Sequence, residues 1–172
     1  NHATSTGNAS STTDQAKFGR SGGFDGSGDW IDIDTINTDI NINAGTISGW
    51  GRMDNYASGA YETLVALYKD NDNRIYIEHY TTNIMYFQDI AGATAKGIGI
   101  DVSGYSGWHH WLMTWDRTAD ELKAYIDGAQ VGSTQTGLGT FSGAPVDSAI
   151  GVHAEDVQPA WNEFWDGYID DV

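Results

Sequence analysis

Adjacent acidic residues and one pair of histidines are the groups in this sequence whose types suggest catalysis or metal binding. The acidic pairs are Asp120-Glu121, Glu155-Asp156 and Asp170-Asp171, and the histidines are His109-His110. Neighbouring side chains of a strand point to opposite faces, so the two members of a pair cannot act on one substrate or bind one ion. The sequence also lacks cysteine, a G-x-S-x-G motif and a phosphate-binding loop. We therefore expect no enzyme and no zinc at the histidines.

Aromatic residues in polar surroundings indicate a different chemistry, the binding of sugars. Pyranose faces stack on exposed rings, while carboxylates and amides accept hydrogen bonds from hydroxyl groups. In residues 74–80 (RIYIEHY) apolar and polar residues alternate, so isoleucines that face the core leave Tyr76, Glu78 and Tyr80 facing outward. The predicted ligand-binding residues are Tyr56, Tyr61, Tyr80, Tyr86, Glu155, Asp156, Trp161 and Asn162.

Strands must position these residues, because no apolar pattern of helical period persists in the chain. The clearest element is a predicted hairpin over residues 106–128. In its first strand Trp111, Met113 and Trp115 alternate with polar or smaller residues, and Asp127-Gly128 begins the next turn. With 22 glycines and two prolines, the 172 residues fit one all-β domain with a two-layer core. The tryptophans predicted to lie in that core are Trp50, Trp108, Trp111 and Trp115.

The net charge of −16 limits the partners that we expect. Eight basic residues cannot neutralise a phosphate track, so nucleic acid is not expected, and an anionic membrane surface is disfavoured for the same reason. No apolar run approaches the ~20 residues of a membrane span, so no membrane insertion is expected. Of the 24 acidic residues 19 are aspartate, which favours turns and supplies the oxygen ligands that calcium prefers. An acidic surface suited to a salty habitat explains the same composition.

The chain divides by composition into two parts. Residues 1–16 are polar, rich in Ser and Thr and without periodicity, which predicts a leader or linker. Residues 17–172 form the predicted domain. No initiator methionine or leader pattern is present, so we expect a module with flanking domains in a larger parent protein.

Four blocks of sequence occur in the order typical of one known superfamily. They are KFGR…FDGSGDWI (17–31), TISGW (46–50), GWHHWLMTWD…YIDG (107–128) and FWDGYIDDV (164–172). The third resembles the GWHH…YVDG hairpin of laminin-G-like, concanavalin A-like domains, and the others resemble the opening, FTISxW and closing FxGxIDDV strands. The family's closing strand usually continues several residues past IDDV, where this sequence ends.

The resemblance implies a concanavalin A-like jelly-roll β-sandwich of two antiparallel sheets. It also implies a structural calcium ion where the first strand meets the last, with Asp25, Asp29, Asp170 and Asp171 as the candidate ligands. The function that it implies is non-catalytic binding of a glycan or polysaccharide by a module of a secreted or cell-surface protein. A structural or protein-binding module is the alternative, and a glycosidase or lyase is less favoured because the family's E-x-D-x-x-E carboxylates are absent.

Overall fold

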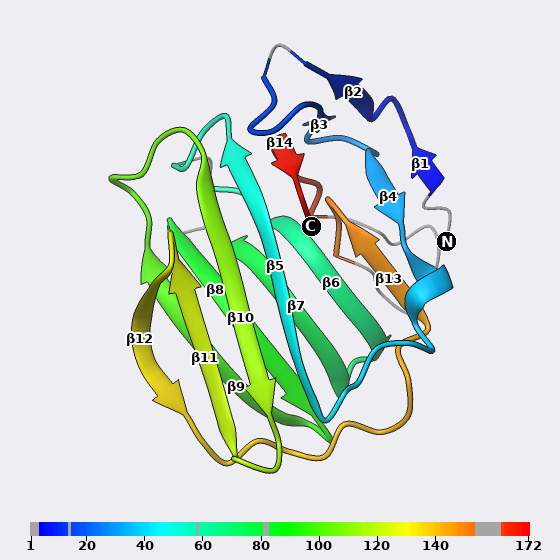
Figure 1. Ribbon diagram of the computed structural model, residues 1–172, viewed down its shortest axis with the longest axis vertical. Coiled ribbons are helices and arrows are strands. Elements are labelled where there is room, and N and C mark those ends of the chain that lie inside the picture. Colours follow the sequence, from blue (N-terminus) through cyan, green and yellow to red (C-terminus); the bar gives the residue numbers. More distant parts are fainter. Residues whose placement is uncertain (1–3, 14, 58, 81–82, 154–162) are drawn as a thin grey trace.

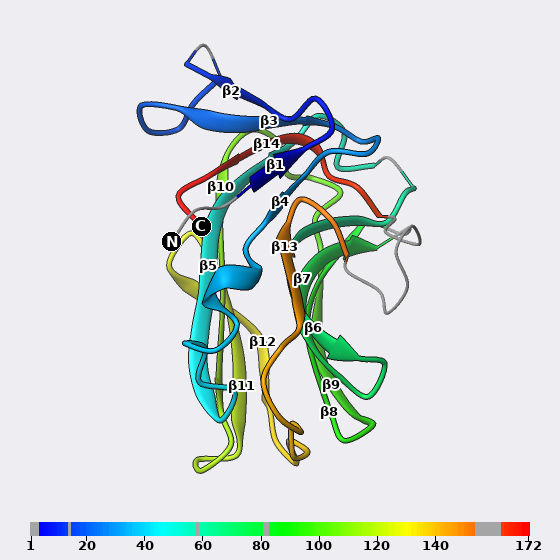
Figure 2. The ribbon, with the colours of Figure 1, turned by 90° about the vertical axis from the view of Figure 1, so that its right-hand side faces the viewer.

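The computed structural model describes residues 4–13, 15–57, 59–80, 83–153 and 163–172, which form two packed antiparallel sheets (Figures 1 and 2). Sheet one has the order β1-β4-β13-β6-β7-β8-β9, and sheet two has the order β12-β11-β10-β5-β14-β3-β2. This architecture confirms the predicted all-β jelly-roll sandwich. The described residues include no helix long and apolar enough to cross a membrane.

The elements, in chain order, are β1 (Thr4–Thr6), β2 (Ser10–Thr12), β3 (Ser21–Asp25), β4 (Trp30–Asp32), a 3-10 turn η1 (Asp34–Ile36), β5 (Ala44–Met53), β6 (Glu62–Asp70), β7 (Asn73–Tyr80), β8 (Ile84–Ala91), β9 (Thr94–Asp101), β10 (His109–Asp116), β11 (Glu121–Ile126), β12 (Ala129–Gln135), β13 (Asp147–Ile150) and β14 (Asp166–Asp170).

The predicted hairpin is the pair β10–β11, and its alternating residues divide as expected. Trp111, Met113 and Trp115 of β10 are buried between the sheets. In β11 the buried residues are Leu122 and Ala124, with Ile126 at the end of the strand. Period-2 patterning therefore placed this hairpin in the correct register against the core.

The Asp127-Gly128 turn explains why the GWHH and DG segments occur together. Both turn residues have positive φ, 52° and 82°, as a two-residue hairpin loop requires. The Asp127 carboxylate reaches back to β10, where Oδ1 accepts the His110 amide at 2.9 Å and Oδ2 lies 2.8 Å from His109 Nδ1. The two histidine rings diverge: His109 contacts Tyr105, and His110 contacts Trp50.

A buried ion pair joins the two sheets at the other end of the same hairpin. Arg117, in the β10–β11 turn, contacts Asp89 of β8 with both terminal nitrogens, at 3.0 Å each. Asp89 is 1 % exposed, and this burial raises its pKa above the ordinary value although Arg117 acts in the opposite direction. The pair is therefore an anchor between the layers rather than a surface contact.

The segment predicted as a leader contributes to the sandwich. Residues 4–6 form β1 and pair with β4, and residues 10–12 form β2 and pair with β3. Each short strand adds to the edge of one sheet (Figure 1). Asp29 holds the connection between them, because its Oδ1 accepts the backbone amide of Asn8 at 2.7 Å. Both faces of an edge strand can meet water, so its residues need not alternate between apolar and polar. The sequence of such a polar Ser/Thr segment therefore does not indicate a strand.

Trp50 is not a core residue, contrary to the sequence prediction. It lies on the outward side of β5, where Ile47, Gly49, Gly51 and Met53 are the buried residues. Lys17 Nζ lies 4.1 Å above its ring, and Phe18 meets it edge-on at 5.8 Å between ring centroids. The residue is thus half-buried under the segment that enters β3 rather than between the sheets.

Candidate carbohydrate-binding face

Three tyrosines gather at one end of the outer face of sheet one. Tyr61 precedes β6, Tyr80 ends β7 and Tyr86 lies on β8. The ring centroids of Tyr61 and Tyr80 are 4.4 Å apart in an edge-to-face arrangement, and those of Tyr80 and Tyr86 are 5.7 Å apart. Tyr80 is 38 % exposed, so an aromatic surface reaches solvent here. We call Tyr61, Tyr80 and Tyr86 the tyrosine row.

The register of the strands produces this row and holds Tyr86 flat. Tyr86 lies opposite Glu78 on one side and opposite Gly99 on the other. A Cβ atom added at Gly97 or Gly99 would come within 2.6 or 2.8 Å of the Tyr86 ring, so that ring covers two positions that have no side chain. Glycines on β9 therefore let the ring lie against the sheet instead of standing away from it.

Polar groups of the same face continue from the tyrosine row. Tyr76 donates its hydroxyl hydrogen to Gln88 Oε1 on the neighbouring strand. Burial, as the largest effect, raises the pKa of Tyr76, so its hydroxyl stays protonated. Arg74 lies near the Tyr76 ring, 5.8 Å from its centroid. Beside these residues Glu78 is 2 % exposed. An aromatic row with a partly exposed amide and guanidinium beside it, those of Gln88 and Arg74, has the kinds of group that a sugar site requires.

Two residues from the last third of the chain, His153 and Glu163, border this face. The His153 ring packs on Tyr76 at 4.7 Å between centroids, and its Nδ1 lies 2.7 Å from Glu163 Oε2. Burial alone would raise the pKa of Glu163. The hydrogen bond and charge of His153, with smaller contributions from Glu78 and Arg74, bring that pKa below its ordinary value.

The predicted ligand-binding residues divide into three groups. Tyr61, Tyr80 and Tyr86 come together in the tyrosine row. Tyr56 is 6 % exposed and donates its hydroxyl to the Gly107 carbonyl at 2.9 Å, so its ring packs in the core and offers no stacking surface. The remaining four predicted residues, Glu155, Asp156, Trp161 and Asn162, lie outside the described residues. Sequence reasoning did not assign Arg74, Gln88, His153 or Glu163 to a site, although the alternation in β7 indicated which way Arg74 faces.

The four predicted calcium ligands do not converge on one point. Asp25 lies opposite Asp166 at one end of the β3–β14 pair, whereas Asp170 lies four residues further along β14, which is about 13 Å at strand spacing. Asp170 Oδ2 accepts the Phe18 amide at 2.7 Å, and Asp171 is exposed. A single ion cannot contact both ends, so the ligand set implied by the resemblance is split.

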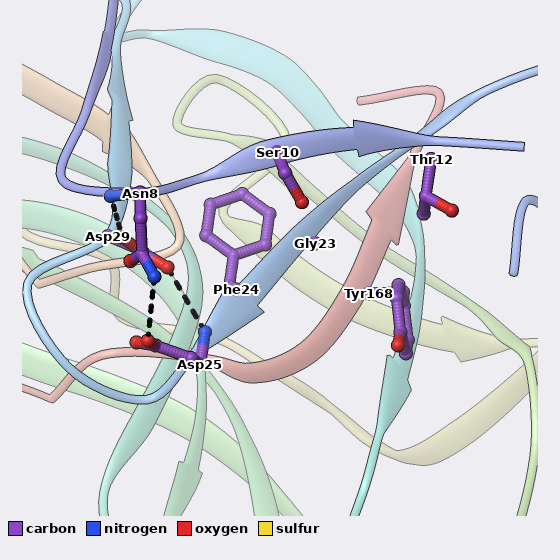
Figure 3. A pocket seen from close by; sticks show the side chains of 8 residues that line it. All are labelled: Asn8, Ser10, Thr12, Gly23, Phe24, Asp25, Asp29 and Tyr168. Atoms are coloured by element: carbon purple, nitrogen blue, oxygen red, sulfur yellow. Dashed lines mark hydrogen bonds between the residues drawn. The ribbon is translucent and has the colours of Figure 1, made fainter.

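The Asp25 end borders a pocket of about 280 Å³ (Figure 3). Asn8 lies between the two carboxylates: its backbone amide contacts Asp29 and its side-chain nitrogen lies 3.2 Å from Asp25 Oδ2. The pocket is lined by Asn8, Ser10, Thr12, Gly23, Phe24, Asp25, Asp29 and Tyr168. Just outside it, the pKa of Asp166 is raised by burial and by the negative charges of Asp54 and Asp25. This concentration of negative charge suits a cation.

Comparisons with solved structures agree on the fold. The binding domain of botulinum neurotoxin serotype D matches 99 % of this chain and 42 % of its own at 15 % identity, with a TM-score of 0.70. The CBM40 of Ruminococcus gnavus IT-sialidase, also solved bound to α2,3 sialyllactose, matches 98 % of this chain and 88 % of its own at 11 % identity, with a TM-score of 0.65. The structure of domains LG4-5 of the mouse laminin alpha1 chain matches over 76 % of this chain and 35 % of its own length. The identity is 10 %, and the TM-score is 0.53.

The chain spans less than half the length of the toxin binding-domain structures. No curated protein matches its sequence. The family model described as the concanavalin A-like lectin/glucanases superfamily matches residues 25–172. That match includes the hairpin, the tyrosine row and the closing strand, and the chain therefore belongs to the concanavalin A-like lectin/glucanases superfamily.

Proposed function

We propose that this domain is a non-catalytic carbohydrate-binding module, and that the outer face of sheet one is its binding surface. The observation that carries the proposal is the tyrosine row, whose exposed member Tyr80 lies beside polar groups that can bind hydroxyls. Three rings in contact across neighbouring strands form a rigid surface, and rigid aromatic surfaces bind with little loss of conformational entropy.

Two of the structural neighbours support a glycan as the ligand. The R. gnavus CBM40 was solved with α2,3 sialyllactose, and a botulinum neurotoxin DC binding domain was solved with a sialylated ligand, SialylT. Modules of this kind act beside other domains, so we further propose that the chain belongs to a larger secreted or cell-surface protein. An analogy of fold does not establish function, and the binding face itself must be tested.

Tyr80→Ala should weaken binding of whichever glycan the domain selects on an array of neutral and sialylated sugars. A stacking ring at the centre of a small site contributes enough for about a tenfold loss of affinity, which corresponds to ~1.4 kcal/mol. Isothermal titration calorimetry would measure the change. The melting temperature should move little, because Tyr80 is at a strand end and partly exposed.

Tyr125→Ala is the matched control, since Tyr125 is a half-buried tyrosine on β11 of the other sheet. It should leave the glycan affinity unchanged. Equal losses in both variants would contradict the placement of the site on sheet one. A domain that binds no glycan but captures a protein partner through the same tyrosines would support the alternative module class.

We also propose that the calcium ion implied by the resemblance binds at the Asp25 end only. Asp25 and Asp166 lie opposite one another, and Asp54 is near enough to help raise the pKa of Asp166. The oxygens of Asp25 already accept N–H groups, but each carboxylate oxygen has a second lone pair for a cation. These residues thus fit a structural ion that would hold β3 against β14.

Asp166→Asn should abolish the stabilisation of the protein by calcium, whereas Asp170→Asn should retain it. At a hundredfold excess over Kd the ion should raise the melting temperature of the native chain by about 5–10 °C in calorimetry. Without calcium, Asp166→Asn should be no less stable than the native chain, because it removes a repelled charge. Calorimetry at matched sodium chloride concentration separates ion binding from screening of the acidic surface. Loss of the calcium response in Asp170→Asn alone would place the ion at the other end.

A further inference from the structure

Three side chains from distant parts of the chain converge behind the tyrosine row. Glu78 comes from β7, His153 follows β13 and Glu163 precedes β14. Each offers one nitrogen or oxygen atom, and these three atoms all lie within 4.8 Å of one another. Glu78 and His153 are 2 % and 4 % exposed, while the Glu163 side chain is 22 % exposed. Two members of the cluster are therefore buried, and the third is partly exposed.

Two carboxylates of this cluster lie close together in a largely buried place. A carboxylate oxygen of Glu78 and one of Glu163 lie within 4.8 Å of each other. Two carboxylates at that distance in a buried place repel each other strongly unless a proton or a positive ion lies between them. Arg74 acts on Glu163 from nearby, but its Nε atom is buried and donates to no acceptor among the described residues.

His153 supplies a second, independent indication of a missing ligand. Its Nδ1 contacts Glu163, whereas its Nε2 is buried and has no hydrogen-bond partner in the part of the chain that the structure describes. The ring is packed against Tyr76, which fixes its plane beside the two carboxylates. A buried polar atom without a partner is costly, and such atoms recur where an ion or water belongs.

We propose that Glu78, His153 and Glu163 bind a divalent transition-metal ion of the zinc type. One imidazole nitrogen and two carboxylate oxygens are ligands that zinc accepts, whereas calcium takes oxygen ligands alone. Ligand atoms around a tetrahedral zinc ion lie about 3.4 Å apart, given bonds of about 2.1 Å. The three atoms, which lie within 4.8 Å of one another, must therefore move closer together to bind one ion.

The ion would have a structural effect different from that of calcium between β3 and β14. His153 and Glu163 are separated by only ten residues in sequence, so an ion bound to both joins the two ends of one connection. Glu78 then fixes that connection to the outer face of sheet one, next to Tyr80. Zinc binding should therefore stabilise the face that we propose for glycans, although the metal site does not depend on glycan binding.

The test measures zinc on the full chain after removal of any affinity tag and treatment with a chelator. Calorimetric titration with zinc chloride at pH 7.5 should give one ion per chain, and cobalt(II) should give the visible absorption of a tetrahedral site. His153→Gln and Glu163→Gln should each weaken zinc binding at least tenfold. Thermal unfolding should show a higher melting temperature with zinc than after chelation, and calcium at the same concentration should not substitute.

His110→Gln is the control, because His110 is a half-buried histidine on sheet two that belongs to no metal-ligating cluster of three among the described residues. It should bind zinc as the native chain does. If His153→Gln fails to fold, zinc binding by Glu163→Gln tests the proposal instead. The Glu163 side chain is partly exposed and the change is isosteric, so this variant should fold. Absence of stoichiometric binding, or binding that Glu163→Gln leaves unchanged (an adventitious ion only), would overturn the proposal. Equal melting temperatures with zinc and after chelation would show instead that a proton balances the cluster.

Discussion

Replacing Arg117 by methionine should lower the free energy of unfolding by about 3–5 kcal/mol, because it leaves a buried carboxylate without its cation. The Asp89 side chain is 1 % exposed and receives both terminal nitrogens of Arg117. Arg117 also donates to the carbonyls of Ile42 and Gly139, which would lose this partner too. At about 2–4 °C per kcal/mol the melting temperature should fall by about 6–20 °C, measured by calorimetry.

The double variant Arg117→Met with Asp89→Leu shows whether the loss comes from the uncompensated charge. Removing both charges and filling the space with apolar atoms is often neutral or stabilising, so the double variant should be clearly more stable than Arg117→Met. Lys123→Met, which breaks a surface pair with Glu121, should leave the melting temperature unchanged, since exposed pairs contribute little. A double variant as unstable as the single one would mean that the lost backbone contacts matter more than the charge.

Trp111→Ala should destabilise the domain about as much as Arg117→Met does, lowering the free energy of unfolding by about 3–5 kcal/mol. The Trp111 side chain is fully buried, and its Nε1 donates to the Gly51 carbonyl at 3.1 Å. A Cβ atom added at Gly51 would lie within 3.1 Å of the Trp111 ring and 2.8 Å from Leu64, so little free space surrounds this contact. Alanine would leave a large cavity and a carbonyl without its donor. Chemical unfolding monitored by circular dichroism would measure the change.

Two further variants separate the cavity from the hydrogen bond. Trp111→Phe keeps most of the buried ring and should cost distinctly less than Trp111→Ala. Trp50→Ala removes the same side-chain volume from the outer face of sheet two, where the ring contacts Lys17 and Phe18 instead of the core. It should therefore be the milder of the two alanine variants. Equal losses at positions 50 and 111 would contradict the assignment of Trp50 to the outside.

The sequence was sufficient to predict the hairpin and the fold class. In β10 and β11 the inner face is consistently apolar, and the outer face is mostly polar apart from Leu112, so the period of two residues identifies the inner side. The same rule failed for Trp50, because its neighbours on both sides are glycines and a large aromatic ring appeared to be the best candidate for the core. Gly51 is buried against Leu64 of the opposite sheet and Gly49 against Val172, and these are tertiary contacts that the local pattern does not contain.

The candidate site was predictable only in part. Alternation in β7 indicated that Tyr76, Glu78 and Tyr80 share a face, and the structure places all three on the outer side of sheet one. The approach of Tyr61 and Tyr86 to Tyr80 depends on inter-strand register, and the meeting of His153 with Glu78 depends on the path of a connection. The spacing of these residues along the sequence therefore predicts neither the contacts among the tyrosine rings nor the contact of His153 with Glu78. The split of the calcium ligands has the same origin, because the antiparallel β3–β14 register decides which aspartates face each other.

The position of β14 within sheet two has a consequence for how this domain is made. Strand β14 lies between β5 and β3, so a strand from late in the sequence joins β2 and β3 on one side to β5 and β10–β12 on the other. During synthesis those two parts have no common neighbour until residues 166–170 have left the ribosome. Such long-range pairing is slow, and unpaired strand edges are prone to associate with other chains. Between the synthesis of β5 and that of β14 the nascent chain therefore carries two open edges on sheet two, and these are the surfaces that a chaperone would have to protect.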